Sequence, residues 1–318
     1  MKKVMAGVDI GGTNTAFGLV DSEGNVYEKN SILTKNYPDV NEFVAALSGA
    51  IKELAGTGTG YELAGIGIGA PNARYYRGTI ELAPNLPWKG VVPLAEMIGR
   101  QTGVPVTITN DANAAAVGEM VFGAAREMKN FIVLTLGTGL GSGIVIDCGL
   151  VYGHTAFAGE LGHTTIVHGG RECGCGKKGC LETYASASGI VRTVLYLLSE
   201  MNADSPLRNM APSAITSKII AEAAAGGDPV AVKAMSHTVE ALGMGIINAI
   251  VFSSPEAVFL FGGLAKAGDM LFNPVREYVD ENIMPVFRGT VSILPSGISE
   301  DNAATLGAAA LAWNDFER

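Results

Sequence analysis

The chain contains 318 residues, about twice the length of an average domain, so its length favours two domains. Hydrophobic residues make up 48% of it and charged residues 17%, which excludes long disordered segments because ample apolar surface is available for large cores. Acidic residues outnumber basic ones by 31 to 22, which gives a net charge of -9. The chain therefore lacks the excess of basic residues that is typical of nucleic-acid-binding proteins.

The predicted elements alternate between strands and helices. Residues 4–9, 15–20 and 26–31 alternate in polarity and are separated by turn-forming segments, which predicts an antiparallel three-stranded meander. A helix with apolar residues at helical spacing follows, and a glycine linker at 56–60 ends it. That helix is expected at 40–54. Further helices are expected at 112–125, 183–199, 215–225, 230–252 and 303–313, and further strands at 64–68, 104–109 and 258–261.

The pattern of the first two strands returns at an offset of 126 residues. A strand at 131–136 precedes the glycine-rich segment 137–141, and a second strand at 142–146 follows it. Gly11 therefore corresponds to Gly137. Two glycine turns at equal offsets between matching strand patterns predict an α/β protein with two related halves.

Two glycine loops are the first candidate binding elements. Glycines let backbone N–H groups approach phosphate oxygens, and an acid beside such a loop can hold a hydrated magnesium ion. One loop alone is typical of an ordinary hairpin, but two at corresponding hairpins would face each other across a cleft and clamp a polyphosphate. The residues concerned are Asp9, Gly11, Gly12, Thr13 and Asn14 in the first loop and Gly137, Thr138 and Gly139 in the second.

The dipeptide Asn110-Asp111 lies between a predicted strand and a predicted helix. Asn and Asp are both strong N-caps, so a purely structural role is one interpretation. The other is that Asp111 accepts a proton from a sugar hydroxyl as its oxygen attacks a phosphoryl group, with Asn110 orienting the substrate. Capping does not forbid the second role.

His163, Cys173, Cys175 and Cys180 form the strongest local signal, because one imidazole and three thiols can close a tetrahedral zinc site. With four protein ligands such a zinc is structural, and it would order Glu160, His163 and Glu182 nearby. Reduced surface thiols are the alternative. Cys148 lies outside the group, and we expect it to be buried and inert.

In a reducing cytosol, clustered cysteines favour a metal site over disulfides. Only five uncharged residues, 4–8, separate Lys3 from Asp9, too few for a signal peptide, and we find no later apolar stretch long enough to cross a bilayer. We therefore expect a cytoplasmic protein with neither a membrane partner nor a nucleic-acid partner.

Taken together, the motifs resemble those of the ROK family (repressor, open reading frame, kinase) of bacterial sugar kinases, in particular its zinc-containing, glucokinase-like members. The resemblance extends from Asp9 to about Gly307. It rests on Asp9 to Asn14, Pro84-Asn85-Leu86 before Trp88, Asn110-Asp111-Ala112-Asn113, Gly137-Thr138-Gly139, Glu160 to His163, Cys173 through Glu182, and Gly262-Gly263.

The resemblance implies an actin-like (ribonuclease H-like) duplicated fold with two domains and a central cleft. The expected domains are 1–118 with the helix 303–318, and 119–302 with the zinc segment 163–180. It also implies ATP with Mg2+, a structural Zn2+, phosphorylation of a hexose at its 6-hydroxyl, and a homodimer. Repressors of the family carry a DNA-binding segment before the first glycine loop, where this chain has eight residues, so we expect a kinase.

The resemblance also assigns roles to residues. Asp111 would be the base, and glucose as substrate would contact Asn85, Asn110, Asp111, Glu160, His163 and Glu182. Gly262 and Gly263 would lie near adenosine. At Pro71-Asn72-Ala73 the chain departs from the family's usual Pro-Gly at the edge of the sugar pocket. N-acetylglucosamine, N-acetylmannosamine, fructose, mannose and allose therefore stay open as substrates, as does a non-catalytic sugar sensor on the same fold.

Overall fold

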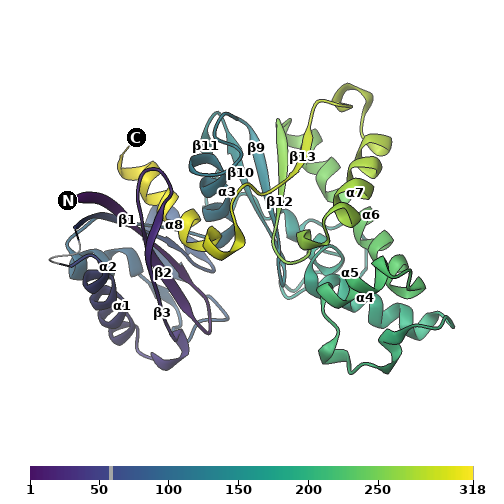
Figure 1. Cartoon of the computed structure of the whole chain (residues 1–318), viewed down its shortest axis with the longest axis horizontal. Coiled ribbons are helices and arrows are strands. Elements are labelled where there is room, and N and C mark those ends of the chain that lie inside the picture. The colour runs from purple at the N-terminus through teal and green to yellow at the C-terminus, as the bar shows by residue number, and fades with distance from the viewer. Residues whose placement is uncertain (57–59, 318) are drawn as a thin grey trace. The chain divides into compact units, whose positions relative to one another are not determined.

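A computed structural model of the chain describes residues 1–56 and 60–317. It divides into two compact units (Figure 1). The first unit comprises residues 1–129, 143–158 and 296–318, and the second comprises 130–142 and 159–295. The predicted linker at 56–60 lies partly outside the described residues.

The first unit is built on a five-stranded sheet with the order β3-β2-β1-β4-β8. Its strands are β1 (Lys2–Ile10), β2 (Thr15–Val20), β3 (Val26–Ile32), β4 (Tyr61–Gly69) and β8 (Val106–Thr109). β1, β2 and β3 pair antiparallel, which confirms the predicted meander, whereas β4 runs parallel to both β1 and β8. The carboxyl ends of β1, β4 and β8 consequently lie at one edge of the sheet.

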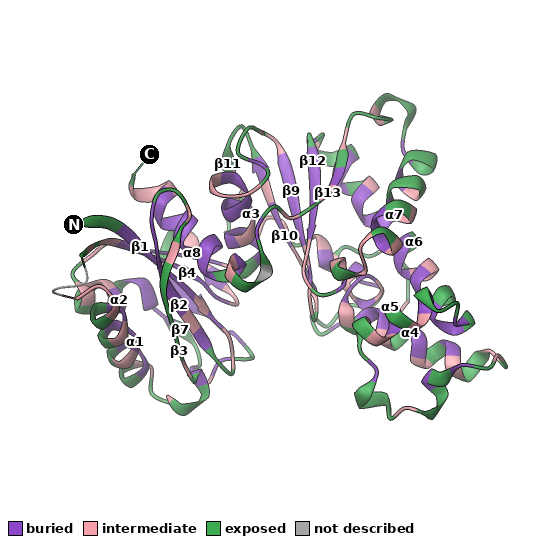
Figure 2. Cartoon of the chain, viewed as in Figure 1, coloured by how far each residue is buried: buried purple, intermediate pink, exposed green. Residues whose placement is uncertain are grey.

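Helices cover this sheet. α1 (Val40–Leu54) buries Phe43, Leu47 and Ile51 in the same core as Ile66 and Ile68 of β4. α2 (Leu94–Thr102) packs beside α1. The buried positions follow β1 and β2 and the inward sides of these helices, whereas every residue of β3 is intermediate or exposed (Figure 2).

Two further helices, α3 (Asp111–Val121) and α8 (Glu300–Phe316), pack against each other in the same unit. α8 lies so close to the sheet that a Cβ at Gly7 of β1 would be 2.0 Å from the Thr305 carbonyl oxygen. A Cβ at Gly67 of β4 would be 1.8 Å from the Ala308 carbonyl oxygen. Glycine at these two strand positions is therefore what allows the helix to reach the sheet.

A small antiparallel sheet completes the first unit: β5 (Ala73–Arg74), β6 (Thr79–Glu81) and β7 (Val91–Val92). It was not predicted, because strands of two or three residues are too short to show a period.

A second five-stranded sheet has the order β11-β10-β9-β12-β13. Its strands are β9 (Phe131–Leu136), β10 (Leu140–Ile146), β11 (Gly149–Leu150), β12 (Ala257–Phe261) and β13 (Ser292–Pro295). β10 pairs antiparallel with β11, and β12 runs parallel to β9 and β13. When the five strands of each sheet are counted along the chain, the first strand lies beside the fourth, and the fourth beside the fifth, in both sheets. This equal order confirms the duplication predicted from the repeated glycine turn.

The helices of the second unit are α4 (Ala187–Glu200), α5 (Ser217–Ala225), α6 (Pro229–Ser253) and α7 (Asp269–Asn282). α6 packs against each of the other three. Among the described residues it is also the one helix long and apolar enough to span a membrane, so our expectation that no stretch has that length is wrong. Its most apolar window is 56% buried, as in the core helix of a globular domain.

Candidate active site

In the first unit, two acids meet at the edge formed by the carboxyl ends of β1, β4 and β8. Asp9 is next to last in β1, and Asp111 follows β8 by two residues. Gly69 ends β4 close to both, since a Cβ there would lie 3.8 Å from Asp9 Oδ1 and 3.9 Å from Asp111 Cα. Burial, with the added negative charge of Asp111, raises the pKa of Asp9 to about 6. This edge therefore carries negative charge that a bound cation would offset.

Asn110 is the N-cap of α3. Its side-chain oxygen accepts a hydrogen bond from the Asn113 backbone N–H at 2.7 Å, so the capping interpretation holds for Asn110. Asp111 is the first helical residue, and its Oδ1 accepts from the Ala112 N–H at 2.9 Å. Because the Asp111 side chain is exposed while its backbone is fixed by the helix, its other oxygen can contact a substrate.

The first glycine loop lies directly after Asp9. Its turn is closed by a hydrogen bond from the Gly11 N–H to the Asn14 carbonyl at 2.9 Å. A Cβ at Gly12 would lie 2.3 Å from the Asn85 carbonyl oxygen, so the loop contacts the segment that carries Asn85. Thr13, Asn14 and Asn85 are exposed. The first unit thus brings together five predicted site features: the two acids, Asn110, the glycine loop and Asn85.

In the second unit, the glycine loop 137–139 connects β9 to β10. The Gly137 carbonyl accepts from the Ala187 N–H at 2.9 Å, and the Thr138 carbonyl accepts from the Ser188 hydroxyl at 2.6 Å. Both donors belong to the first turn of α4, whose N-cap is Ser186. The loop therefore lies at the N-terminus of a 14-residue helix, where the helix dipole favours anions. Sequence reasoning missed this contact, because it depends on the approach of segments 50 residues apart.

Gly262 and Gly263 follow β12, the strand beside β9. Gly262 has a positive φ of 102°, which strongly favours glycine, and a Cβ there would be 2.9 Å from the Leu136 carbonyl carbon. The Leu264 N–H donates to the Leu136 carbonyl at 3.1 Å. The structure thus places the predicted adenosine segment next to the start of the second glycine loop.

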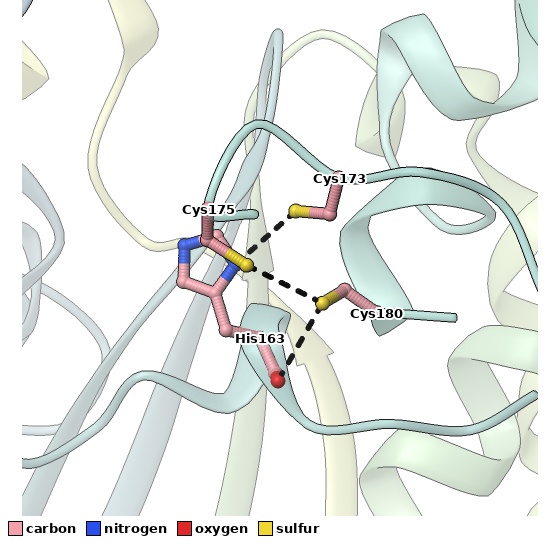
Figure 3. A group of neighbouring side chains, drawn as sticks. All are labelled: His163, Cys173, Cys175 and Cys180. Atoms are coloured by element: carbon pink, nitrogen blue, oxygen red, sulfur yellow. Dashed lines mark hydrogen bonds between the residues drawn. The ribbon is translucent and has the colours of Figure 1, made fainter. Parts of the chain in front are cut away.

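The four predicted metal ligands lie together in the second unit (Figure 3). His163 ends the 3-10 helix η3 (Leu161–His163), and a tight turn brings Cys173 and Cys175 opposite Cys180. All four ligand atoms lie within 4.8 Å of one another. Cys175 Sγ and Cys180 Sγ are 3.7 Å apart, far beyond the ~2.05 Å of a disulfide. The cysteines are therefore free thiols.

The spacing of these atoms fits a tetrahedral metal. Zn–S bonds of about 2.3 Å and Zn–N bonds of about 2.0–2.1 Å place ligand atoms about 3.8 Å (S to S) and 3.6 Å (S to N) apart. The structure has 3.7 Å between Cys175 Sγ and Cys180 Sγ and 3.5 Å between Cys173 Sγ and His163 Nδ1. Burial raises the pKa of the Cys173 thiol to about 12, so its thiolate needs a cationic partner. The residues present therefore fit such a metal.

Glu160 and Glu182 flank His163. His163 Nε2 lies 3.9 Å from Glu160 Oε2, and His163 Nδ1 lies 3.7 Å from Glu182 Oε1. The exposed fractions of the Glu160 and Glu182 side chains are 47% and 22%, so both can contact a ligand. The second unit thus brings together Glu160, His163 and Glu182.

Comparison with known proteins identifies the family. The family model described as "ROK family" matches residues 5–315. The chain belongs to the ROK family. It is 39% identical to a glucokinase of Streptomyces coelicolor over 85% of each chain. It is 35% identical to a glucokinase of Thermotoga maritima over 98% of this chain and 97% of that one.

Among ROK proteins of known structure, the chain resembles a glucokinase from Streptomyces griseus in complex with glucose and AMPPNP. The TM-score is 0.77 at 34% sequence identity, over 97% of this chain and 98% of that one. This likeness, together with the two sheets of equal strand order, shows the expected actin-like fold. The ROK resemblance inferred from the motifs is confirmed.

Two further details concern Asn72 and Cys148. Asn72 has a φ of 54°, the left-handed region in which glycine is favoured and Asn is tolerated. Its side-chain amide donates to the carbonyls of Glu81 and Leu82, each at 3.2 Å, and is thereby tied to the main chain.

Cys148 is exposed, so our expectation of a buried thiol is wrong. It lies in the β10–β11 hairpin turn with a φ of 61°.

Proposed function

We propose that this ROK protein is an ATP-dependent glucokinase, which transfers the γ-phosphoryl group of ATP to the 6-hydroxyl of glucose. The observation that carries the proposal is the pairing of Asp9 and Asp111 beside the first glycine loop, at the carboxyl ends of three parallel strands. Ligands of open α/β sheets bind outside such ends. The glucose and AMPPNP bound to the Streptomyces griseus relative support the choice of substrates.

In the proposed reaction Asp111 holds the sugar hydroxyl and takes its proton. The sugar oxygen forms a bond to the γ-phosphorus while the bond from that phosphorus to the β,γ-bridging oxygen breaks, and ADP leaves. Asp111 suits this role because the first turn of α3 fixes its backbone. Further sugar contacts are proposed for Asn85 and Asn110 in the first unit and for Glu160, His163 and Glu182 in the second.

The nucleotide is proposed to contact both glycine loops. Gly11, Gly12, Thr13 and Asn14, with Gly137, Thr138 and Gly139, would hold phosphates through backbone and side-chain donors. Gly262 and Gly263 would lie near adenosine. Asp9 would hold Mg2+ through its hydration shell, and that ion would offset charge on the transferring phosphoryl group. The raised pKa of Asp9 supports this role, because a bound cation favours the ionised carboxylate.

His163, Cys173, Cys175 and Cys180 are proposed to hold a structural Zn2+. His163 would bind it through Nδ1, the nitrogen 3.5 Å from Cys173 Sγ, so that Nε2 is left for the sugar. A site closed by four protein ligands has no open position for a reacting water.

A homodimer, a cytoplasmic location and the absence of a nucleic-acid partner stay predictions. Sedimentation equilibrium tests the homodimer.

A coupled ADP-release assay with Mg2+ tests the proposed function. The substrates compared are glucose, mannose, fructose, allose, N-acetylglucosamine and N-acetylmannosamine. We expect kcat/KM to be highest for glucose. A higher value for another sugar would reassign the substrate, and sugar binding without ADP release from any of the six would make the protein a sensor and not a kinase.

A further inference from the structure

The first unit contains a cavity of about 230 Å3 whose lining residues have no role in the proposed reaction. Two segments of that unit line it, residues 74–77 and 154–156. The lining residues include two arginines and a histidine but no acid, although the chain as a whole carries a net charge of -9. The lining residues are Arg74, Tyr76, Arg77, His154, Thr155 and Ala156. The wall of the cavity is therefore basic in an acidic protein.

Contacts between the two segments hold the cavity in shape. Arg74 Nη1 donates a hydrogen bond to the Thr155 carbonyl, and the Arg74 guanidinium lies over the Phe157 ring, 3.7 Å from its centroid. Next to this contact, the rings of Tyr75 and Tyr152 stack with their centroids 3.9 Å apart. The cavity is therefore formed before any ligand enters, which lowers the entropic cost of binding.

The charges at the cavity do not balance. Arg74 Nε lies 3.2 Å from Glu81 Oε2, and Arg77 Nη1 lies 3.2 Å from Glu81 Oε1. Two guanidinium groups thus share one carboxylate, and one positive charge is left over. The Arg77 side chain is 72% exposed, and Nη1 is its one nitrogen bonded to a described residue. Nε and Nη2 of Arg77 are therefore available to a ligand.

These donors suit a phosphate group. Nε and Nη2 of a guanidinium form a fork that binds two oxygens of a phosphate or a carboxylate. A carboxylate has no oxygen beyond those two, whereas phosphate can also accept from the exposed His154 and Thr155 side chains on the other segment. The volume lies below the ~300–1,000 Å3 of sites for drug-sized ligands, as expected for a small anion.

We propose that this cavity is a second phosphate-binding site, separate from the glycine loops, which takes free phosphate or the phosphate group of a sugar phosphate. Arg77 binds the anion through Nε and Nη2, Arg74 supplies a fixed positive charge, and His154 and Thr155 donate from the opposite segment. The site goes beyond the proposed function and does not require it. Only the use of glucose 6-phosphate as a probe rests on that function.

The test follows the imidazole NMR signals of the full chain, which has only four histidines. The signal that is missing in His154→Ala identifies the reporter at the cavity. Inorganic phosphate, glucose 6-phosphate and acetate are titrated at constant pH, with chloride keeping the ionic strength constant. Saturating AMPPNP and Mg2+ are present, so that the glycine loops proposed to hold nucleotide are already occupied.

Arg77→Ala is compared with Arg100→Ala as a matched control. Arg100 is 78% exposed, lies in α2 of the same unit, and pairs with a glutamate four residues away, as Arg77 does. Both substitutions therefore remove one exposed, paired arginine, but only the first removes it from the cavity. Thermal unfolding of each variant checks that the fold is kept.

Two or three hydrogen bonds to a charged group correspond to a Kd on the order of 1 mM, and the loss of one weakens binding by about tenfold or more. We therefore expect phosphate to shift the His154 signal saturably in the wild type and in Arg100→Ala, and to bind at least about tenfold more weakly to Arg77→Ala. Acetate should bind more weakly than phosphate. A lower Kd for glucose 6-phosphate would assign the site to sugar phosphates, and a lower Kd for inorganic phosphate would assign it to the free anion.

Three results would overturn the proposal: no saturable shift of the His154 signal, equal phosphate affinity in Arg77→Ala and Arg100→Ala, or acetate bound as tightly as phosphate. Failure of AMPPNP to bind would instead count against the proposed function. In that case the same titrations of the nucleotide-free protein still decide whether the cavity binds phosphate.

Discussion

The two glycine loops occupy corresponding places in a duplicated scaffold, yet their surroundings differ. The first follows Asp9, a half-buried acid whose pKa a second acid, Asp111, helps to raise, and it packs against the main chain at Asn85. At the offset of 126 residues, the second loop has Thr135 in place of Asp9. It packs against the side chain of Glu182 and the first turn of α4.

The difference shows how duplication separates two tasks. The glycine turn between two strands is kept in both halves, because it depends on glycine and on strand order. The charged groups are not kept: the first loop stands beside the two acids for which we propose roles toward protons and cations. The second loop packs against a neighbouring helix terminus and against a carboxylate that also contacts the cluster of His163, Cys173, Cys175 and Cys180. The variants below test this division, from the largest expected effect to the smallest.

Asp111→Asn should have the largest effect, since it removes the proton acceptor while leaving the α3 backbone in place. We expect turnover to fall by at least about a hundredfold, the usual loss for an acid–base group, with sugar binding changed only severalfold. Steady-state ADP release and glucose titration measure the two quantities. Asp269→Asn, which also removes an acid from the first turn of a helix, is the control. Near-normal turnover in Asp111→Asn would refute its role as base.

Asp9→Asn should stabilise the protein at neutral pH while impairing activity. Because the pKa of Asp9 is raised from 3.8 to about 6, the ionised form is disfavoured in the folded state. Its destabilising effect is absent below pH 4, grows between pH 4 and 6, and is complete above that range. At 1.36 kcal/mol per pH unit, the free energy of unfolding should be about 3 kcal/mol higher in the variant at pH 7–8.

Urea unfolding of Asp9→Asn between pH 4 and 8 gives the measurement. Thr135→Val, at the corresponding position of the other half, should show no such pH dependence. A gain for Asp9→Asn that is equal at pH 4 and pH 8 would contradict the account.

Gly12→Ala and Gly139→Ala compare the loops directly. In Gly12→Ala the new Cβ would lie 2.3 Å from the main-chain carbonyl oxygen of Asn85. That oxygen can move only if the backbone between β6 and β7 moves with it. In Gly139→Ala the new Cβ would lie 2.5 Å from the carboxylate end of the Glu182 side chain, which can rotate away. Overpacking usually lowers the free energy of unfolding by ~1–3 kcal/mol. We expect Gly12→Ala to lose an amount near the upper end of this range and Gly139→Ala an amount near the lower end.

Denaturant unfolding measures both glycine variants. Gly49→Ala, in α1 with open space around its Cβ, should be neutral or slightly stabilising. If Gly139→Ala is the costlier of the two loop variants, Glu182 is held more rigidly than the comparison assumes.

Cys175→Ser should have the smallest effect on the reaction, because it acts on the second loop and the sugar residues only through the order of the cluster. We expect one tightly held zinc per chain in the wild type, its loss in the variant, and a severalfold higher KM for glucose with kcat changed less. Elemental analysis and steady-state kinetics supply the readouts. Cys148→Ser, at the exposed cysteine outside the cluster, should keep its metal. Full activity in a protein shown to contain no zinc would contradict this prediction.

Much of this arrangement could be predicted from the sequence. The meander, the duplicated glycine turn and most strands and helices follow from polarity periods and glycine placement. α7 was missed because Pro274 lies inside it, and α2 because nine residues with mixed polarity give a weak period. The grouping of His163, Cys173, Cys175 and Cys180 was predictable because these residue types are rare and closely spaced.

Contacts between distant segments could not be predicted. The hydrogen bond from Leu140 to Glu182 joins residues 42 apart, and Gly69 beside Asp9 and Asp111 is one glycine among 42 in the chain. Only the folded structure shows which of these residues come into contact. The exposure of Cys148 was mispredicted because a free cysteine is usually buried, whereas here it occupies a left-handed turn position.

The close fit of α8 against Gly7 and Gly67 has a consequence for protein synthesis. The first sheet is complete once β8 ends at Thr109, but the helix that seals its face starts at Glu300. At a translation rate of about 5–20 residues per second, roughly 10–40 s elapse between the two. During that interval the growing chain exposes the apolar strand surface of β1 and β4 that α8 covers in the folded protein.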